Sequence, residues 1–206
     1  MMSMTDSEVL DCVYNTWEIE SGAIAAVKDT VSPQSIIAAV ETLARCKGRI
    51  VTSGCGTSGA AAKKIAHTLC CVERPAAFLS PADAVHGALG LLQPEDVLIL
   101  ISKGGGTAEI VNLIPACKTK GAKLIAVTEN EQSVLAKNAD ITLAVKVKKE
   151  PCPFNMLATA STLSVIATFD AICIALMRYM GYTREQFAVI HPGGAVGHRL
   201  LTEGGK

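Results

Sequence analysis

The sequence predicts an α/β fold in which a doubly wound, parallel, five-stranded sheet is flanked by helices on both faces. Two observations predict it. From Arg49 onward, short and almost entirely apolar segments alternate with helical ones, which is typical of parallel strands buried on both faces. Apolar residues make up 50% of the chain but aromatic residues only 4%. The core must therefore consist mainly of aliphatic side chains, which suit helices packed closely on a sheet.

The first 47 residues are predicted to be helical and to precede the sheet. Apolar residues such as Ile36, Val40 and Leu43 recur at a spacing close to the 3.6-residue period of a helix. Ser32 and Pro33 suit the cap and the first position of a second helix in this segment. The chain has 206 residues, which is enough for one well-buried domain and short for two. We expect a single domain over 1–206, with N-terminal helices over 1–47 and an α/β core with a C-terminal loop over 48–200.

Five strands and four helices are expected after residue 48. The strands are expected at 49–54, 76–80, 96–102, 122–129 and 140–147. The helices are expected at 57–72, 107–121, 131–139 and 155–182, and the last is the long terminal helix. In a sheet of this kind, ligands bind beyond the carboxyl ends of the strands. The residues that follow each strand are therefore the candidates for a functional site.

The charge balance and the cysteine pattern limit the possible partners. Lys and Arg number 19 and so do Asp and Glu, and without a basic stripe neither nucleic acid nor a membrane surface is an expected partner. The N-terminus lacks the pattern of a secretory signal. The longest apolar segment, 156–177, is interrupted by Thr, Ser and Asp170, which predicts a buried helix.

The eight cysteines form no CxxC pair, so we expect reduced thiols, no metal site and a cytoplasmic protein.

The turn after the first expected strand has a glycine pattern that fits two kinds of site. Gly54, Gly56 and Gly59 match G-x-G-x-x-G, which occurs in dinucleotide-binding folds. That fingerprint also needs an acidic residue at the end of the second strand, but here that strand ends at Ser80. A tight turn alone would explain the glycines, but it would not explain the two hydroxyl residues between the last two of them.

A second turn of the same kind follows the third expected strand. Ser102 and Thr107 flank Lys103 and three consecutive glycines, just before a predicted helix. Free backbone N–H groups at such a position, with hydroxyl groups beside them, favour an anion such as phosphate. Because both turns lie at equivalent strand ends, we expect them to enclose one small phosphate ester. The expected phosphate-binding residues are Gly56, Thr57, Ser58, Ser102, Lys103, Gly104, Gly105, Gly106 and Thr107.

Four residues are candidates for proton transfer. His86 and His191 lie in segments rich in Gly and Pro, and a histidine titrates near neutral pH. Glu150 follows the last strand, ahead of a Pro-Cys-Pro turn; it is either a base or a surface charge beside two lysines, which would lower its pKa. Glu109 begins the helix after the second turn, where it is either a second carboxylate of the site or a charge that compensates the helix dipole.

Together these motifs resemble the sugar isomerase (SIS) domain and, more narrowly, the bacterial arabinose-5-phosphate isomerases. The segments that carry the resemblance are GCGTSG (54–59), SPADAVHGALG (80–90), ISKGGGTAE (101–109), KVKKEPCP (146–153) and HPGGAVGHRL (191–200). This chain departs from the family at three places. The family commonly has a lysine where this chain has Thr57, and an aspartate where it has Ala88. It also commonly has a second serine and an acid in the segment where this chain has glycines 104–106. Many members carry a pair of CBS modules, and we expect a short form without them.

The resemblance implies a flavodoxin-like three-layer sandwich and an aldose–ketose isomerase for D-ribulose 5-phosphate and D-arabinose 5-phosphate. The reaction would pass through an enediolate and feed the synthesis of Kdo for lipopolysaccharide or capsule. Glu150 is the expected base, Glu109 the second carboxylate, and His86 and His191 the acid/base or hydroxyl-polarising groups, with no metal or organic cofactor. A homotetramer with shared active sites is also implied. Two alternatives stay open: a non-catalytic SIS module that senses a sugar phosphate, and another SIS isomerase such as a hexulose-phosphate isomerase.

Overall fold

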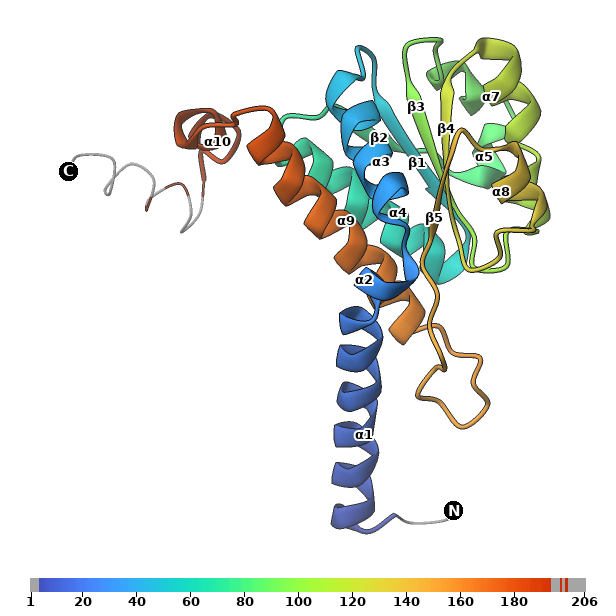
Figure 1. Ribbon diagram of the computed structural model, residues 1–206, viewed down its shortest axis with the longest axis vertical. Helices are drawn as coiled ribbons and strands as arrows, with labels where there is room; N and C mark the ends of the chain where they lie inside the picture. The colour runs from blue at the N-terminus through green and yellow to red at the C-terminus, as the bar shows by residue number, and fades with distance from the viewer. Residues whose placement is uncertain (1–3, 194–196, 198, 200–206) are drawn as a thin grey trace.

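The computed structural model (Figure 1) describes residues 4–193, 197 and 199, and its centre is a parallel five-stranded sheet. The order is β2-β1-β3-β4-β5, and every neighbouring pair is parallel. The predicted fold class is confirmed, with one strand in each expected segment. The strands are β1 (Ile50–Gly54), β2 (Ala76–Phe78), β3 (Val97–Ile101), β4 (Lys123–Thr128) and β5 (Ile141–Ala144).

Helices cover both faces of this sheet, which makes three layers. Ile99 and Ile125 point to one face, whereas Leu98 and Leu124 point to the other, and all four side chains are buried. Because side chains alternate across a strand and both faces are covered, the strands are almost entirely apolar. The first face is covered by α3 (Pro33–Arg45), α4 (Gly56–Cys70) and α9 (Ala160–Tyr179). The second is covered by α5 (Pro81–Ala84), the 3-10 helix η1 (Ala88–Leu91), α6 (Ala108–Val111), α7 (Ile114–Lys120) and α8 (Val134–Asn138).

The N-terminal residues are helical, as the sequence predicts, and form α1 (Asp6–Ala25), α2 (Val27–Thr30) and α3. The side chain of Ser32 caps α3 by accepting the N–H of Ser35, and Pro33 is the first helical residue. A capping box joins Thr5 and Glu8 at the start of α1. α1 extends away from the sheet (Figure 1), and none of its residues is buried.

The helix expected over 107–121 is divided into α6 and α7. Pro115 has no N–H, so it cannot donate to the carbonyl of Val111, four residues earlier. It occupies the first turn of α7 instead, where an N–H has no intrahelical partner. The prediction of one continuous helix was wrong because it overlooked this proline.

The long terminal helix begins at Ala160 and not at Asn155, as the sequence had suggested. Asn155 has a positive φ of 54°, which is incompatible with a right-handed helix. The thiol of Cys152 accepts the N–H groups of Met156 and Leu157, at 3.2 and 3.1 Å. The residues between β5 and α9 therefore form a loop in which a side chain of the loop accepts hydrogen bonds from the loop's own backbone.

A last helix, α10 (Arg184–Ile190), follows α9 and was not predicted. Thr183 and Gln186 form its capping box, so the sequence did contain the signal. α10 lies at the end of α9 that is farther from the β5–α9 loop (Figure 1). The predicted single domain over 1–206 includes 194–196, 198 and 200–206, which lie outside the described residues, and it stays a prediction.

α9 is long and apolar enough to cross a membrane by length and composition alone. Its residues Phe169, Ile172 and Leu176 are buried in the core on one face of the sheet. The helix also contacts α1, α3 and α4. These are the contacts of a core helix, which agrees with the prediction of a buried helix in this segment.

Candidate active site

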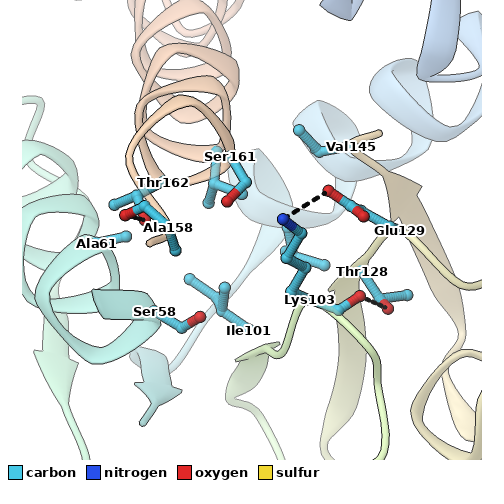
Figure 2. A pocket seen from close by; sticks show the side chains of 12 residues that line it. Ser58, Ala61, Ile101, Lys103, Thr128, Glu129, Val145, Ala158, Ser161 and Thr162 are labelled. Atoms are coloured by element: carbon cyan, nitrogen blue, oxygen red, sulfur yellow. Dashed lines mark hydrogen bonds and ion pairs between the residues drawn. The ribbon is translucent and has the colours of Figure 1, made fainter. Parts of the chain in front are cut away.

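A small cavity lies beyond the carboxyl ends of β1, β3 and β4 and is closed by the start of α9. Its volume is about 30 Å³, which is room for about one or two water molecules. Figure 2 shows that Lys103, Glu129 and Ser161 converge on it from three different elements. A sugar phosphate is larger than this cavity, so it would also need to occupy the surface beyond it. The lining residues include Ser58, Ile101, Lys103, Thr128, Glu129, Ala158, Ser161 and Thr162.

Glu150 is buried directly beside this cavity and is held by several donors. Its side chain has no exposed surface. Lys103 Nζ lies 2.7 Å from its Oε1, the N–H of Thr159 donates to its Oε2 at 3.0 Å, and Ser161 donates through both its hydroxyl and its N–H. Burial raises the pKa of Glu150, but these hydrogen bonds and the charge of Lys103 outweigh it and lower the pKa below its ordinary value.

This environment excludes one of the two interpretations of Glu150 from the sequence. The carboxylate is not a surface charge, because only 3% of the residue is exposed. The cation that pairs with it is Lys103, from the turn after β3, and not the adjacent Lys148 or Lys149, as the sequence had suggested. The hydrogen bonds from Thr159 and Ser161 tie this carboxylate to the N-terminus of α9.

Glu129 is a carboxylate of the site that the sequence did not single out. It follows β4, and its Oε1 lies 3.7 Å from Nζ of Lys103. Burial raises the pKa of Glu129, and the charge of Lys103 offsets this only in part. The signal that could have found it is its position as the last residue of an expected strand, at the edge of the sheet where ligands bind.

The triple-glycine turn is organised by Ser102, which is itself buried. The hydroxyl groups of Ser102 and Thr107 lie 2.8 Å apart, and Ser102 Oγ accepts the N–H of Gly105 at 3.1 Å. Gly105 has a φ of +67°, and a Cβ there would lie 2.1 Å from Oγ of Ser133. The turn therefore brings both predicted hydroxyl groups together, while Gly104 and Gly106 stay exposed.

The first glycine turn packs the start of α4 tightly on the end of β1. A Cβ on Gly54 would lie 2.7 Å from the backbone of Ser58, and one on Gly59 would lie 2.7 Å from the carbonyl oxygen of Gly54. Ser58 lines the cavity, whereas Gly56 and Thr57 are exposed. Close packing therefore accounts for two of the three glycines, as the tight-turn interpretation requires.

Glu109 and Glu150 do not share a cavity. Glu109 is exposed at the start of α6 and lines a second, larger hollow of about 630 Å³. Gly56, Lys63 and Ser80 line the same hollow. The N-terminal turn of α4 thus borders both hollows, through Ser58 on one side and Gly56 on the other.

The two predicted histidines are not brought to Glu150 within one chain. His86 is exposed in the turn between α5 and η1. The ring of His191 stacks on Phe187 at 3.9 Å between centroids, and its Nδ1 lies 2.9 Å from the Phe187 carbonyl oxygen. α9 has 20 residues, so α10 and the cavity lie about 30 Å apart along it. A role for His191 at this site would require a second chain.

Within residues 4–193, 197 and 199, no group of three or more His, Cys, Asp or Glu side chains is placed to hold a metal ion. An amine, a half-buried carboxylate and hydroxyl groups line the cavity, and the buried carboxylate of Glu150 lies beside it, bound to Lys103 and Ser161. A carboxylate can accept a proton from carbon, an amine can stabilise a developing oxyanion, and hydroxyl groups can orient a polyhydroxy ligand.

Several known proteins are similar to this chain in sequence and fold. The arabinose 5-phosphate isomerase KdsD of Pseudomonas aeruginosa is 41% identical over 201 residues, which cover 96% of this chain and 61% of the relative. A candidate sugar-phosphate isomerase from Listeria monocytogenes has a crystal structure with a TM-score of 0.92 and 60% identity, covering 93% of this chain and 100% of that one. An Escherichia coli CFT073 protein in complex with arabinose 5-phosphate has a TM-score of 0.86 and 34% identity, covering 92% of this chain and 100% of that one.

A match over more than half of the sequence identifies the family. The chain spans about 61% of the length of the Pseudomonas relative. The model of the SIS domain matches residues 42–188, which include both glycine turns, Glu129 and Glu150. Together with the sheet order and the relatives above 30% identity, this match shows that the chain belongs to the SIS domain family.

Proposed function

We propose that this protein is an aldose–ketose isomerase that interconverts D-ribulose 5-phosphate and D-arabinose 5-phosphate through an enediolate. The observation that carries the proposal is the buried Glu150 carboxylate, paired with Lys103 beside two glycine turns that carry hydroxyl groups. The relatives support the choice of pentose, since one is an arabinose 5-phosphate isomerase and another was solved with arabinose 5-phosphate bound. The product would feed the synthesis of Kdo for lipopolysaccharide or capsule.

Each step of the reaction has a candidate group. The N–H and hydroxyl groups of the two turns hold the phosphate, with Ser58, Ser102 and Thr107 contributing. Glu150 removes the proton from C1 of the ketose or C2 of the aldose and returns it to the other carbon. Lys103 stabilises the negative charge that develops on the enediolate oxygen. Glu109 is the second carboxylate, and these roles need no metal ion or organic cofactor.

We also propose that the active enzyme is a cytoplasmic homotetramer with shared active sites. His86 and His191 remain the expected acid/base groups, and a neighbouring chain would have to supply at least His191. The exposed apolar residues of α1, among them Val13, Tyr14 and Trp17, favour burial against another copy. Nucleic acid and membranes are not expected partners.

The proposal is tested by an isomerase assay on a panel of phosphopentoses and phosphohexoses. We expect turnover of arabinose 5-phosphate and ribulose 5-phosphate, with kcat/KM at least about tenfold higher than for any hexose phosphate. A preference for hexulose 6-phosphate would contradict the choice of pentose and indicate a different SIS isomerase.

A non-catalytic sugar-phosphate sensor is the second candidate, and one observation favours it. The hydrogen bonds around Glu150 lower its pKa, and a carboxylate stabilised in its ionised form is a weaker base. Calorimetric binding of a sugar phosphate by a protein that turns over no member of the panel would establish the sensor instead.

A further inference from the structure

Lys103 lies between two carboxylates, and these differ in how fully their oxygens are hydrogen-bonded. Its Nζ is 2.7 Å from Oε1 of Glu150 and 3.7 Å from Oε1 of Glu129. Glu150 also accepts hydrogen bonds from Thr159 and Ser161. Oε1 of Glu129, in contrast, is buried and has no hydrogen-bond partner among the described residues. Because a buried carboxylate oxygen without a hydrogen bond is unfavourable, Glu129 offers Lys103 a second position.

The backbone of Lys103 is held in place from the same side as Glu129. The N–H of Glu129 and Oγ1 of Thr128 donate to the carbonyl oxygen of Lys103, at 2.9 and 2.8 Å. The side chain of Lys103 is 41% exposed, whereas that of Glu150 has no exposed surface. The ammonium group can therefore move from Glu150 to Glu129 through rotation of its own side chain, while the backbone and Glu150 stay in place. Figure 2 shows the side chain of Lys103 directed toward Glu129.

We propose that Glu129 is a positioning residue for the isomerisation, which draws Lys103 away from Glu150 and leaves Glu150 the stronger proton acceptor. The effect on rate rests on the proposed function; the effect on the ionisation of Glu150 does not. While Lys103 pairs with Glu150, the ionised carboxylate is stabilised and has less tendency to take a proton from carbon. Pairing with Glu129 removes that stabilisation and moves the ammonium group by only a short distance.

The electrostatics agree with this geometry. The charged groups of the site come from three segments: Lys103 from the turn after β3, Glu129 from the end of β4, and Glu150 from the β5–α9 loop. α4 and α9 contribute the uncharged side chains of Ser58 and Ser161 to the cavity, together with Thr162. The pKa of Glu129 is raised, chiefly by burial, and that of Glu150 is lowered. Two neighbouring carboxylates with pKa values pushed apart are typical of acid–base sites.

The first experiment follows the Glu150 carboxyl carbon by NMR during a pH titration of the ligand-free protein. We expect Glu129→Gln to lower the pKa of Glu150 by about half a unit or more, because a negative charge is lost and Lys103 pairs with Glu150 alone. The matched control is Glu131→Gln, since Glu131 is exposed two residues further on and pairs with Lys146. The control should leave the pKa of Glu150 unchanged. An unchanged or raised pKa in folded Glu129→Gln overturns the proposal.

The second experiment repeats the titration in a Lys103→Met background. If Glu129 acts through Lys103, most of the shift caused by Glu129→Gln disappears there. A shift of the same size in both backgrounds means that the two carboxylates act on each other directly, and it overturns the role of Lys103. These titrations need no turnover, so they decide the matter even if the wild-type protein isomerises no sugar phosphate.

Kinetics then test the effect on rate in an active protein. We expect Glu129→Gln to lower kcat by about threefold to tenfold with KM little changed, because a weaker base slows proton transfer and leaves phosphate binding intact. The acid limb of the kcat/KM profile should move to lower pH, in parallel with the pKa of Glu150. Loss of activity without that displacement would indicate a merely structural residue and overturn the proposal.

Discussion

At the scale of single residues, the environment of Glu150 sets the clearest expectation for catalysis. Glu150→Gln keeps the size of the side chain but removes the proton acceptor. We expect kcat to fall by at least about 100-fold, the lower end of the contribution of a positioned general base, with substrate binding largely retained. Exchange of the substrate C2 proton with deuterated solvent should fall in parallel.

Glu109→Gln provides the comparison for this variant, since Glu109 is exposed and lines the other hollow. If Glu109→Gln abolishes turnover and Glu150→Gln does not, Glu109 is the base. If both variants stay active while His86→Asn or His191→Asn is inactive, a histidine performs the proton transfer. Thermal unfolding of each variant shows whether a loss of activity reflects a loss of fold.

The cysteines provide a second prediction at this scale, with a defined pH dependence. Hydrogen bonds from the N–H groups of Leu157 and Met156 lower the pKa of Cys152, while burial raises the pKa of Cys117 to about 11 and that of Cys173 to about 12. A lowered pKa means more thiolate at neutral pH, and thiolate is the reactive form. We therefore expect iodoacetamide at pH 7 to label Cys152 well before Cys117 or Cys173, as followed by peptide mass spectrometry.

Raising the pH should reduce the difference in labelling rate between Cys152 and another thiol only where solvent can reach that other thiol. Because the lowered pKa of Cys152 leaves more of it ionised at pH 7, its labelling rate should increase less with pH than that of a thiol with an ordinary pKa. Labelling of Cys117 or Cys173 in the native protein as fast as that of Cys152 would contradict the described packing.

Some of these residues were predictable from the sequence, and others were not. Ser102, Lys103 and Glu150 lie at or just after the ends of expected strands, and parallel strands present their carboxyl ends at one edge, so strand positions were enough to propose them. Glu129 also follows a strand, but its importance depends on the distance between its carboxylate and Lys103. That distance is set by the pairing of β3 with β4, which a sequence pattern does not specify.

At the scale of elements, the turn between β3 and α6 depends on the backbone of Gly105. Its φ of +67° lies in the left-handed region, and a Cβ would lie 2.4 Å from Cβ of Ser133, which caps α8. We expect Gly105→Ala to lower the free energy of unfolding by about 1–3 kcal/mol from strain of this kind. In a domain of this size that corresponds to a decrease in Tm of roughly 2–12 °C, measurable by calorimetry.

Gly104→Ala is the matched control for that substitution. Gly104 is in the same turn, but a Cβ there would have no neighbour within 4 Å. Its Tm should stay close to that of the wild type. Equal losses of stability in the two variants would mean that the turn does not depend on the conformation of Gly105.

The elements differ in how well the sequence predicted them, and the reason is physical. The strands were found because burial on both faces requires continuous apolar segments. The start of α9 was misplaced because the residues before it are arranged by hydrogen bonds to Cys152 and Glu150, which are side-chain contacts within a loop. α10 was not predicted, although Thr183 and Gln186 have the residue types and spacing of a capping box.

At the scale of the whole molecule, α1 is the feature that a single chain leaves unexplained. It has no buried residue, and Trp17 is 61% exposed. Fully burying a side chain of this kind stabilises an assembly by about 2–3 kcal/mol. We expect sedimentation to show a homotetramer, and we expect Trp17→Glu to shift it toward smaller species. A wild-type protein that sediments as an active monomer would refute this prediction.

Mixing two inactive variants tests whether the active sites are shared. If a site combines Glu150 of one chain with His191 of another, Glu150→Gln and His191→Asn are each inactive alone. Mixed assemblies then contain some sites with both wild-type residues. We expect activity to appear after the two variants are co-refolded, and none to appear if each site is built from one chain.

The contacts of α9 also bear on how the protein is made. α1 and α3 are translated before the sheet, but their partner α9 is translated only after all five strands. The sheet can begin to form strand by strand, since β1, β3, β4 and β5 pair in the order in which they are synthesised. One of its faces stays without α9 until all five strands have been translated. A stall before α9 would therefore leave apolar surface of the sheet open to chaperones.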